Sequence, residues 1–150
     1  MKKIIAIALS VLAFASVASA QSRSLGIRAG GDAEISYQMN AGGANFMEFD
    51  LGKALLGGDY AGFQLSAIYD FIFASVDNFN FYVGPGAQAN FWTSSSNSSQ
   101  FGIGVGGQLG LEYQFGTIPF ILSFDWRPMW NFIGNYGSWS SAALSFRYRF

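Results

Sequence analysis

Bulky apolar residues alternate with small or polar residues along positions 101–115. The first set comprises Phe101, Ile103, Val105, Gly107, Leu109, Leu111, Tyr113 and Phe115, and the second comprises Gly102, Gly104, Gly106, Gln108, Gly110, Glu112 and Gln114. Successive side chains of a β-strand point to opposite faces, so this period of two predicts one strand with an apolar and a polar face. A helix would mix the two sets around its axis and would contain five glycines, which are unfavourable there.

The same alternation recurs in seven further segments, at residues 24–30, 33–39, 45–51, 60–73, 79–92, 118–130 and 138–150. An apolar outer face and a polar inner face are typical of strands in a transmembrane β-barrel, whereas a soluble lipocalin-like barrel needs the opposite polarity. Each transmembrane strand needs ~9–11 residues, so eight strands leave room for connections and ten leave almost none. The predicted fold is therefore all-β, an eight-stranded antiparallel transmembrane β-barrel.

Composition supports this fold. Charged residues make up 11% of the chain and aromatic residues 18%, whereas soluble domains average roughly 25% charged residues. Beyond residue 20 there is no run of 18 apolar residues, which excludes transmembrane helices and leaves a closed barrel as the structure that lipid permits. Residues 21–150 carry six basic and nine acidic side chains without a basic run, so we expect no nucleic-acid binding.

The first 20 residues have the features of a secretory signal peptide. Two lysines precede an apolar run at 4–14, and Ala18 and Ala20 form an A-x-A cleavage site. The apolar run is about half the ~20 residues of a spanning helix, so cleavage after Ala20 is favoured over a membrane anchor. We expect a Sec-type signal peptide at 1–20, a barrel domain at 21–150 and a location in the bacterial outer membrane. Because the sequence has no cysteine, we expect no lipid attachment through cysteine and no disulfides.

An even number of strands places both termini on the periplasmic side. Periplasmic turns are then expected near 40–44, 74–78 and 116–118, and outward loops near 30–32, 52–59, 93–100 and 131–137. Tyr and Trp prefer the membrane–water interface. We therefore expect an outer aromatic girdle of Trp92, Trp130 and Trp139, and a periplasmic girdle of Phe71, Phe73, Phe79, Tyr113, Phe115, Phe120, Tyr148 and Phe150.

Ten charged residues fall on the predicted inner faces: Arg28, Glu34, Glu48, Asp50, Asp70, Glu112, Asp125, Arg127, Arg147 and Arg149. An eight-stranded barrel is just wide enough for side chains to fill, and charges in it are costly unless paired and hydrogen-bonded. The sequence thus predicts a charge network that plugs the lumen, with interior glycines making room for larger side chains. We expect Glu112 to pair with Arg147 or Arg149. A path for ions or protons, or a small-ligand site, is the alternative.

Catalytic and cofactor chemistry finds little support. Histidine and cysteine are absent, which removes Ser-His and Asp-His hydrolytic centres and argues against zinc or transition-metal sites. Glu48 and Asp50 could serve in acid–base chemistry, but their spacing of two is simply the period of the inner face. The stretch at 84–89 matches G-x-G-x-x-G/A without a following helix, and we expect Pro85, like Pro128, to mark a bulge or bend. We expect no enzyme, cofactor or metal.

Two segments carry a family resemblance. Residues 144–150, LSFRYRF, are similar to the C-terminal signature by which outer-membrane proteins are recognised for barrel insertion, with Phe146, Tyr148 and Phe150 as its aromatic positions. Residues 122–130, LSFDWRPMW, resemble a stretch of uncharacterised small barrels. With its eight predicted strands, the chain resembles the small OmpX/OmpA-like outer-membrane β-barrel family, whose members include adhesins, membrane-tethering proteins and enzymes.

These observations predict a structural or envelope-related protein with a plugged, porin-like barrel. An adhesion or ligand-binding module that acts through the loops at 52–59, 93–100 and 131–137 is the first alternative, and a narrow channel is the second. We expect a monomer whose partners are outer-membrane lipids and, during biogenesis, the barrel-assembly machinery. Any surface ligand is unidentified.

Overall fold

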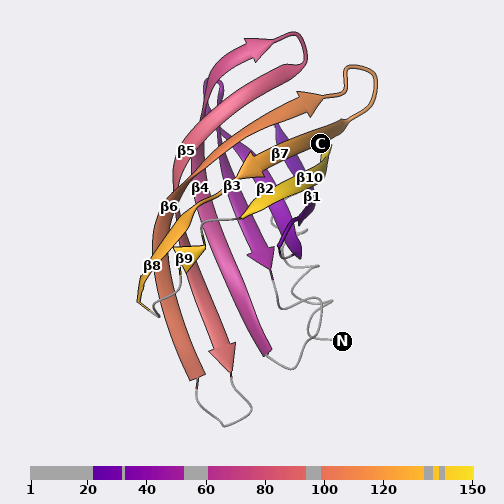
Figure 1. Ribbon diagram of the computed structural model, residues 1–150. Helices are drawn as coiled ribbons and strands as arrows, with labels where there is room; N and C mark the ends of the chain where they lie inside the picture. Colours follow the sequence, from indigo (N-terminus) through magenta and orange to yellow (C-terminus); the bar gives the residue numbers. More distant parts are fainter. Residues whose placement is uncertain (1–21, 32, 53–60, 94–98, 134–136, 139–140) are drawn as a thin grey trace.

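The computed structural model describes residues 22–31, 33–52, 61–93, 99–133, 137–138 and 141–150 (Figure 1). The signal peptide predicted at 1–20, with Ala18 and Ala20, lies outside these residues, and so do residues 32, 53–60, 94–98 and 134–136, in or next to the predicted outward loops. Within the described part of the chain, no helix is long and apolar enough to cross a membrane.

The described chain consists of strands joined by short connections. They are β1 (Arg23–Ala29), β2 (Ala33–Gly42), β3 (Asn45–Gly52), β4 (Ala61–Val76), β5 (Phe79–Thr93), β6 (Ser99–Gln114), β7 (Phe120–Trp126), β8 (Met129–Ile133), β9 (Gly137–Ser138) and β10 (Ala142–Arg149). β7 and β8 both pair with β6, while β10 pairs with β7 and β9 pairs with β8. β7 and β8 therefore form one row of the sheet, and β9 and β10 form the next.

The sheet closes on itself. Each row pairs in antiparallel orientation with the next row along the chain, and β1 pairs with β10, where Ile27 lies opposite Phe146. The long strands β4, β5 and β6 form one wall of the tilted structure in Figure 1. The result is a closed eight-stranded antiparallel barrel, which confirms the predicted fold.

Burial alternates across the barrel wall as the sequence pattern predicts. Inward side chains that are at most 1% exposed include Ser36, Glu48, Asp50, Ser66, Asp70, Asp125, Arg127 and Arg147. On the outside, Ile27 is 62% exposed and Phe73 is 60% exposed. A continuous apolar exterior around a polar interior is the arrangement of a barrel that lies in lipid. Three inward apolar residues, Ile68, Ile121 and Met129, were not singled out in the sequence and help to fill the lumen.

The short turns gather at one end of the barrel, which we call the turn end. There the backbone nitrogens of Arg23 and Phe150 each donate to the other's carbonyl oxygen. Members of the predicted periplasmic girdle meet at this end, including Phe79 and Tyr113, whose ring centroids lie 4.8 Å apart. In the predicted outer girdle, Trp130 lies on the outer wall, whereas the side chains of Trp92 and Trp139 lie outside the described part.

The two strand prolines differ in their effect. Pro128 interrupts the predicted strand at 118–130 and separates β7 from β8, as expected for a residue that lacks an N–H donor. Pro85 does not cause the predicted bulge, because it pairs with Gly107 without a shift of register. The register shift of this hairpin lies in β4, between Ile72 and Ala74.

Candidate functional site in the barrel lumen

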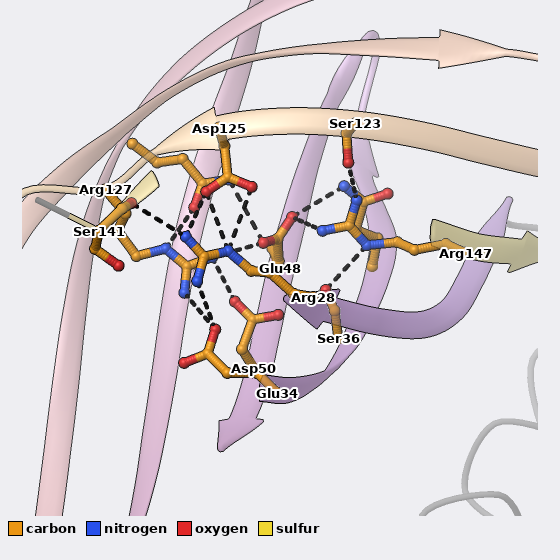
Figure 2. Close-up of polar contacts among 12 residues, drawn as sticks. Arg28, Glu34, Ser36, Glu48, Asp50, Ser123, Asp125, Arg127, Ser141 and Arg147 are labelled. Atoms are coloured by element: carbon orange, nitrogen blue, oxygen red, sulfur yellow. Dashed lines mark hydrogen bonds and ion pairs between the residues drawn. The ribbon is translucent and has the colours of Figure 1, made fainter. Parts of the chain in front are cut away.

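Three buried arginines lie at the centre of the lumen, on strands that are far apart in the sequence. Arg28 comes from β1, Arg127 follows β7 and Arg147 comes from β10, and each side chain is at most 4% exposed. Each occupies an inward position of its row, so the closed sheet directs the guanidinium groups into the same space. Figure 2 shows them among the carboxylates of β2, β3 and β7.

Arg127 connects the two sides of the barrel. Its Nη2 atom lies 2.7 Å from Glu48 Oε1 and 2.5 Å from Asp50 Oδ2, both on β3. Its Nε atom donates to Gln108 Oε1 at 2.7 Å, and Nη1 lies 3.4 Å from Glu34 Oε2. The guanidinium thus holds β3 and β6 to the row that contains β7.

Arg28 makes the second set of ion pairs. Its Nη2 atom donates to Asp125 Oδ1 at 2.6 Å, and its Nε atom donates to the same oxygen at 3.1 Å. Its Nη1 atom donates to Glu34 Oε2 at 2.8 Å. Charge-assisted bonds made by two nitrogens of one guanidinium fix its orientation as well as its position. Glu34 also accepts from Gln64 Nε2 at 3.1 Å, so β4 joins the network.

Arg147 completes the network toward the turn end. Its Nη2 atom donates to Glu48 Oε2 at 2.8 Å, its Nε atom to Ser36 Oγ at 2.9 Å and its Nη1 atom to Ser123 Oγ at 2.5 Å. Glu48 accepts from Gln38 Nε2 as well, at 3.0 Å. Glu48 therefore receives Arg127 on one oxygen and Arg147 on the other, and it joins the two arginine groups into a single cluster (Figure 2).

The predicted partner of Glu112 is wrong. Glu112 Oε1 accepts from Asn80 Nδ2 at 2.9 Å and from Gln114 Nε2 at 2.8 Å, without a direct ion pair to an arginine of the described residues. Arg149 donates instead to Gln114 Oε1 at 3.0 Å. Arg147 is already engaged by Glu48 and two hydroxyls, so amides satisfy the carboxylate that the charge pattern assigned to an arginine.

Asp70 also lies apart from the arginine cluster. Its side chain is fully buried, yet neither carboxylate oxygen has a hydrogen-bond partner. Four other buried oxygens in the described residues share this property: Asp50 Oδ1 on β3, Ser66 Oγ on β4, Tyr82 Oη on β5 and Ser145 Oγ on β10.

Glycines on the inner faces make close packing possible. A Cβ atom at Gly110 would overlap the Tyr82 ring, and one at Gly104 would overlap the Asn131 side chain. A Cβ atom at Gly52 would lie 2.7 Å from Glu34 Cγ. Larger inward side chains therefore take up the space that these glycines leave.

The neutral members of the network were not identified from the sequence. They are Ser36, Gln38, Gln64, Asn80, Gln108 and Ser123. Their inward register was the available signal, since they share the face of the charged residues, but the partner of each depends on side chains from other strands.

The arrangement resembles a structural cluster more than a reactive centre. Its guanidinium groups and most of its carboxylates bind one another, which leaves few groups free to act on a substrate. The described residues contain no group of three or more His, Cys, Asp or Glu side chains that could hold a metal ion. Phe146 and Tyr148 lie on the outer face of β10 and Phe150 follows it; their role as an insertion signal stays a prediction.

Comparisons with known proteins support the fold. No protein-family model matches the chain, and no curated protein matches it. Among solved structures, the chain is similar to Neisserial surface protein A, with 16% identity, a TM-score of 0.57 and coverage of 87% of this chain and 94% of that one. It also matches the Yersinia pestis outer membrane protein Ail, determined in a phospholipid bilayer nanodisc, with 16% identity, a TM-score of 0.48 and coverage of 87% and 98%. The chain thus has the fold of eight-stranded outer-membrane barrels.

Proposed function

We propose that this chain is an integral outer-membrane protein with a structural role in the cell envelope, and that its lumen is closed by the arginine–carboxylate cluster. The observation that carries the proposal is the burial of Arg28, Arg127 and Arg147 within ion pairs that join strands that are not neighbours in the barrel. An open aqueous pore would leave these side chains hydrated. The apolar exterior and the similarity to outer-membrane barrels support the location.

The partners that we propose follow from the outer surface. Lipid chains would cover the exposed apolar belt, and the barrel-assembly machinery would recognise residues 144–150 during insertion. Among the described residues, every row of the barrel pairs with a row on each side, and the β1–β10 pairing closes the ring; this favours a monomer. We propose no catalytic role. Loop-mediated adhesion is the alternative, but the loops on which it rests lie largely outside the described residues.

Conductance in planar lipid bilayers tests the plug. We expect the wild-type protein to show no large stable current, and the Arg127→Ala variant to show more frequent or larger openings. Arg149→Ala is the matched control, because Arg149 is only partly buried and contacts the Gln114 amide near the turn end. A large, stable conductance of the wild-type barrel would contradict the plug and favour a narrow channel.

A further inference from the structure

Asp70 differs from the other buried carboxylates of the described chain. The other buried carboxylates each accept at least one hydrogen bond from an arginine or an amide; they are Glu34, Glu48, Asp50, Glu112 and Asp125. Asp70 is equally inaccessible to solvent, and both of its oxygens lack a donor. An ionised carboxylate in such a place is strongly unfavourable unless a positive charge compensates it.

The adjacent strands supply no donor to Asp70. Its register partner on β3 is Phe46, whose side chain is a phenyl ring. The facing position on β5 is Gly84, which has no side chain and whose added Cβ would lie 2.8 Å from the Asp70 Cα atom. The next inward residue on β5 is Tyr82, whose hydroxyl oxygen is buried and also lacks a partner. Two unpartnered oxygen-bearing groups therefore lie on neighbouring strands of the same wall.

The charges that act on Asp70 do not neutralise it. They are Glu48 on β3, Asp125 on β7, Arg127 after β7 and Arg147 on β10. Both arginines are committed to Glu48, and Arg127 also binds Asp50. Among the described residues, six carboxylates and four guanidinium groups are buried, so the interior carries an excess of negative charge.

We propose that the lumen takes up one small monovalent cation at the Asp70 carboxylate, the buried carboxylate of the described chain whose two oxygens both lack a donor. A single positive charge at this point gives Asp70 the partner that it lacks and reduces the excess of buried carboxylates. It can be supplied as a proton, which converts the carboxylate to a neutral acid, or as a sodium ion held without covalent change. This site stands on the lumen geometry and is independent of the proposed envelope role.

Unfolding rates of the full barrel in detergent micelles test the site. Wild type, Asp70→Asn and Glu112→Gln would be unfolded in urea at about pH 8 in choline chloride, then in sodium chloride of equal strength, then at about pH 5. We expect acid or sodium to slow wild-type unfolding about tenfold, which corresponds to about 1.4 kcal/mol in the free-energy barrier to unfolding. Asp70→Asn, which removes the charge at nearly constant shape, should unfold slowly and respond to neither. Glu112→Gln should keep the wild-type response, because amides already satisfy Glu112.

The two sources of charge give different outcomes. A response to acid that is lost in Asp70→Asn identifies a proton, and a response to sodium that is lost in the same variant identifies sodium. Equal responses of wild type and Asp70→Asn to both conditions would overturn the proposal. If Asp70→Asn does not refold, infrared spectra and unfolding rates of the wild type decide. The absence of a buried carboxylic-acid band in sodium-free buffer, together with an unfolding rate that does not depend on sodium, would then overturn the proposal.

Discussion

Replacement of Arg127 by methionine should strongly destabilise the barrel, chiefly through Asp50. Methionine has a similar length but carries no charge or donor. Asp50 Oδ2 receives its hydrogen bond from Arg127 at 2.5 Å, and Asp50 Oδ1 has no partner. The Arg127→Met variant therefore leaves a fully buried carboxylate with no donor. Glu48 is affected less, since Arg147 and Gln38 still donate to its other oxygen.

The magnitude follows from the loss of one partner of a buried ion pair. Such a loss typically lowers the free energy of unfolding by ~3–5 kcal/mol, because the remaining charge is uncompensated. Adding Asp50→Asn removes that charge, so the Arg127→Met/Asp50→Asn double variant should be more stable than Arg127→Met alone. Residues in direct contact usually show coupling energies of about 0.5–3 kcal/mol. We expect a value near the upper end for this pair.

Reversible urea unfolding in lipid vesicles, followed by tryptophan fluorescence, measures these differences. The heat-modifiable shift of the folded barrel on unboiled gels provides an independent readout. Arg149→Met is the matched control, because Arg149 is partly buried and binds one amide; we expect a change below about 1 kcal/mol. An Arg127→Met variant as stable as Arg149→Met, or a double variant without coupling, would refute the assignment of Arg127 as the central pairing residue.

Two further predictions address packing and polarity. Gly110→Ala should lower the free energy of unfolding by about 1–3 kcal/mol, because the added methyl group overlaps the Tyr82 ring. Gly116→Ala is the control and should be tolerated, since its Cβ would lie 3.6 Å from Asn78 Nδ2. Equal effects of the two variants in urea unfolding would contradict the packed lumen. Leu109→Arg places a charge on the outer face of β6 and should cost about 2–4 kcal/mol if this face lies near the bilayer midplane, whereas Ile118→Arg at the turn end should cost about 0–1 kcal/mol. Similar unfolding energies for the two arginine variants would contradict the membrane orientation of the strands.

Much of the architecture could be predicted because its signals are local. At 101–115 the alternation of residue types identified both the strand and its inward face, and β6 spans Ser99–Gln114 with this polarity. The period of two follows from backbone geometry and needs no knowledge of neighbouring strands. Pro128 likewise acts through its own missing N–H group. Pro85 shows the limit of this reasoning. Its missing N–H group predicted a bulge, but Pro85 pairs with Gly107 in an unshifted register.

Side-chain partners in the lumen could not be predicted in this way. Arg28 and Asp125 are 97 residues apart in the chain and meet only because the first and last rows pair. Glu112 was assigned to an arginine because charge was the visible signal, but the nearby amides of Asn80 and Gln114 satisfy it. Asp70 lacks a hydrogen-bond donor because Phe46 and Gly84 lie beside it on the adjacent strands. The alternation within each strand does not show which residues of other strands will lie beside a carboxylate.

By itself, the sequence determined which side chains of this protein face lipid and which face the lumen, since alternation along a strand is a property of consecutive residues. The tertiary structure decided which arginine meets which carboxylate. Most of those pairs join strands that are not neighbours in the sheet, and their geometry depends on the register and tilt that arise only when β1 pairs with β10 and the sheet closes. For the same reason, the cluster around Glu48 and the unpartnered carboxylate of Asp70 became visible only in the closed barrel.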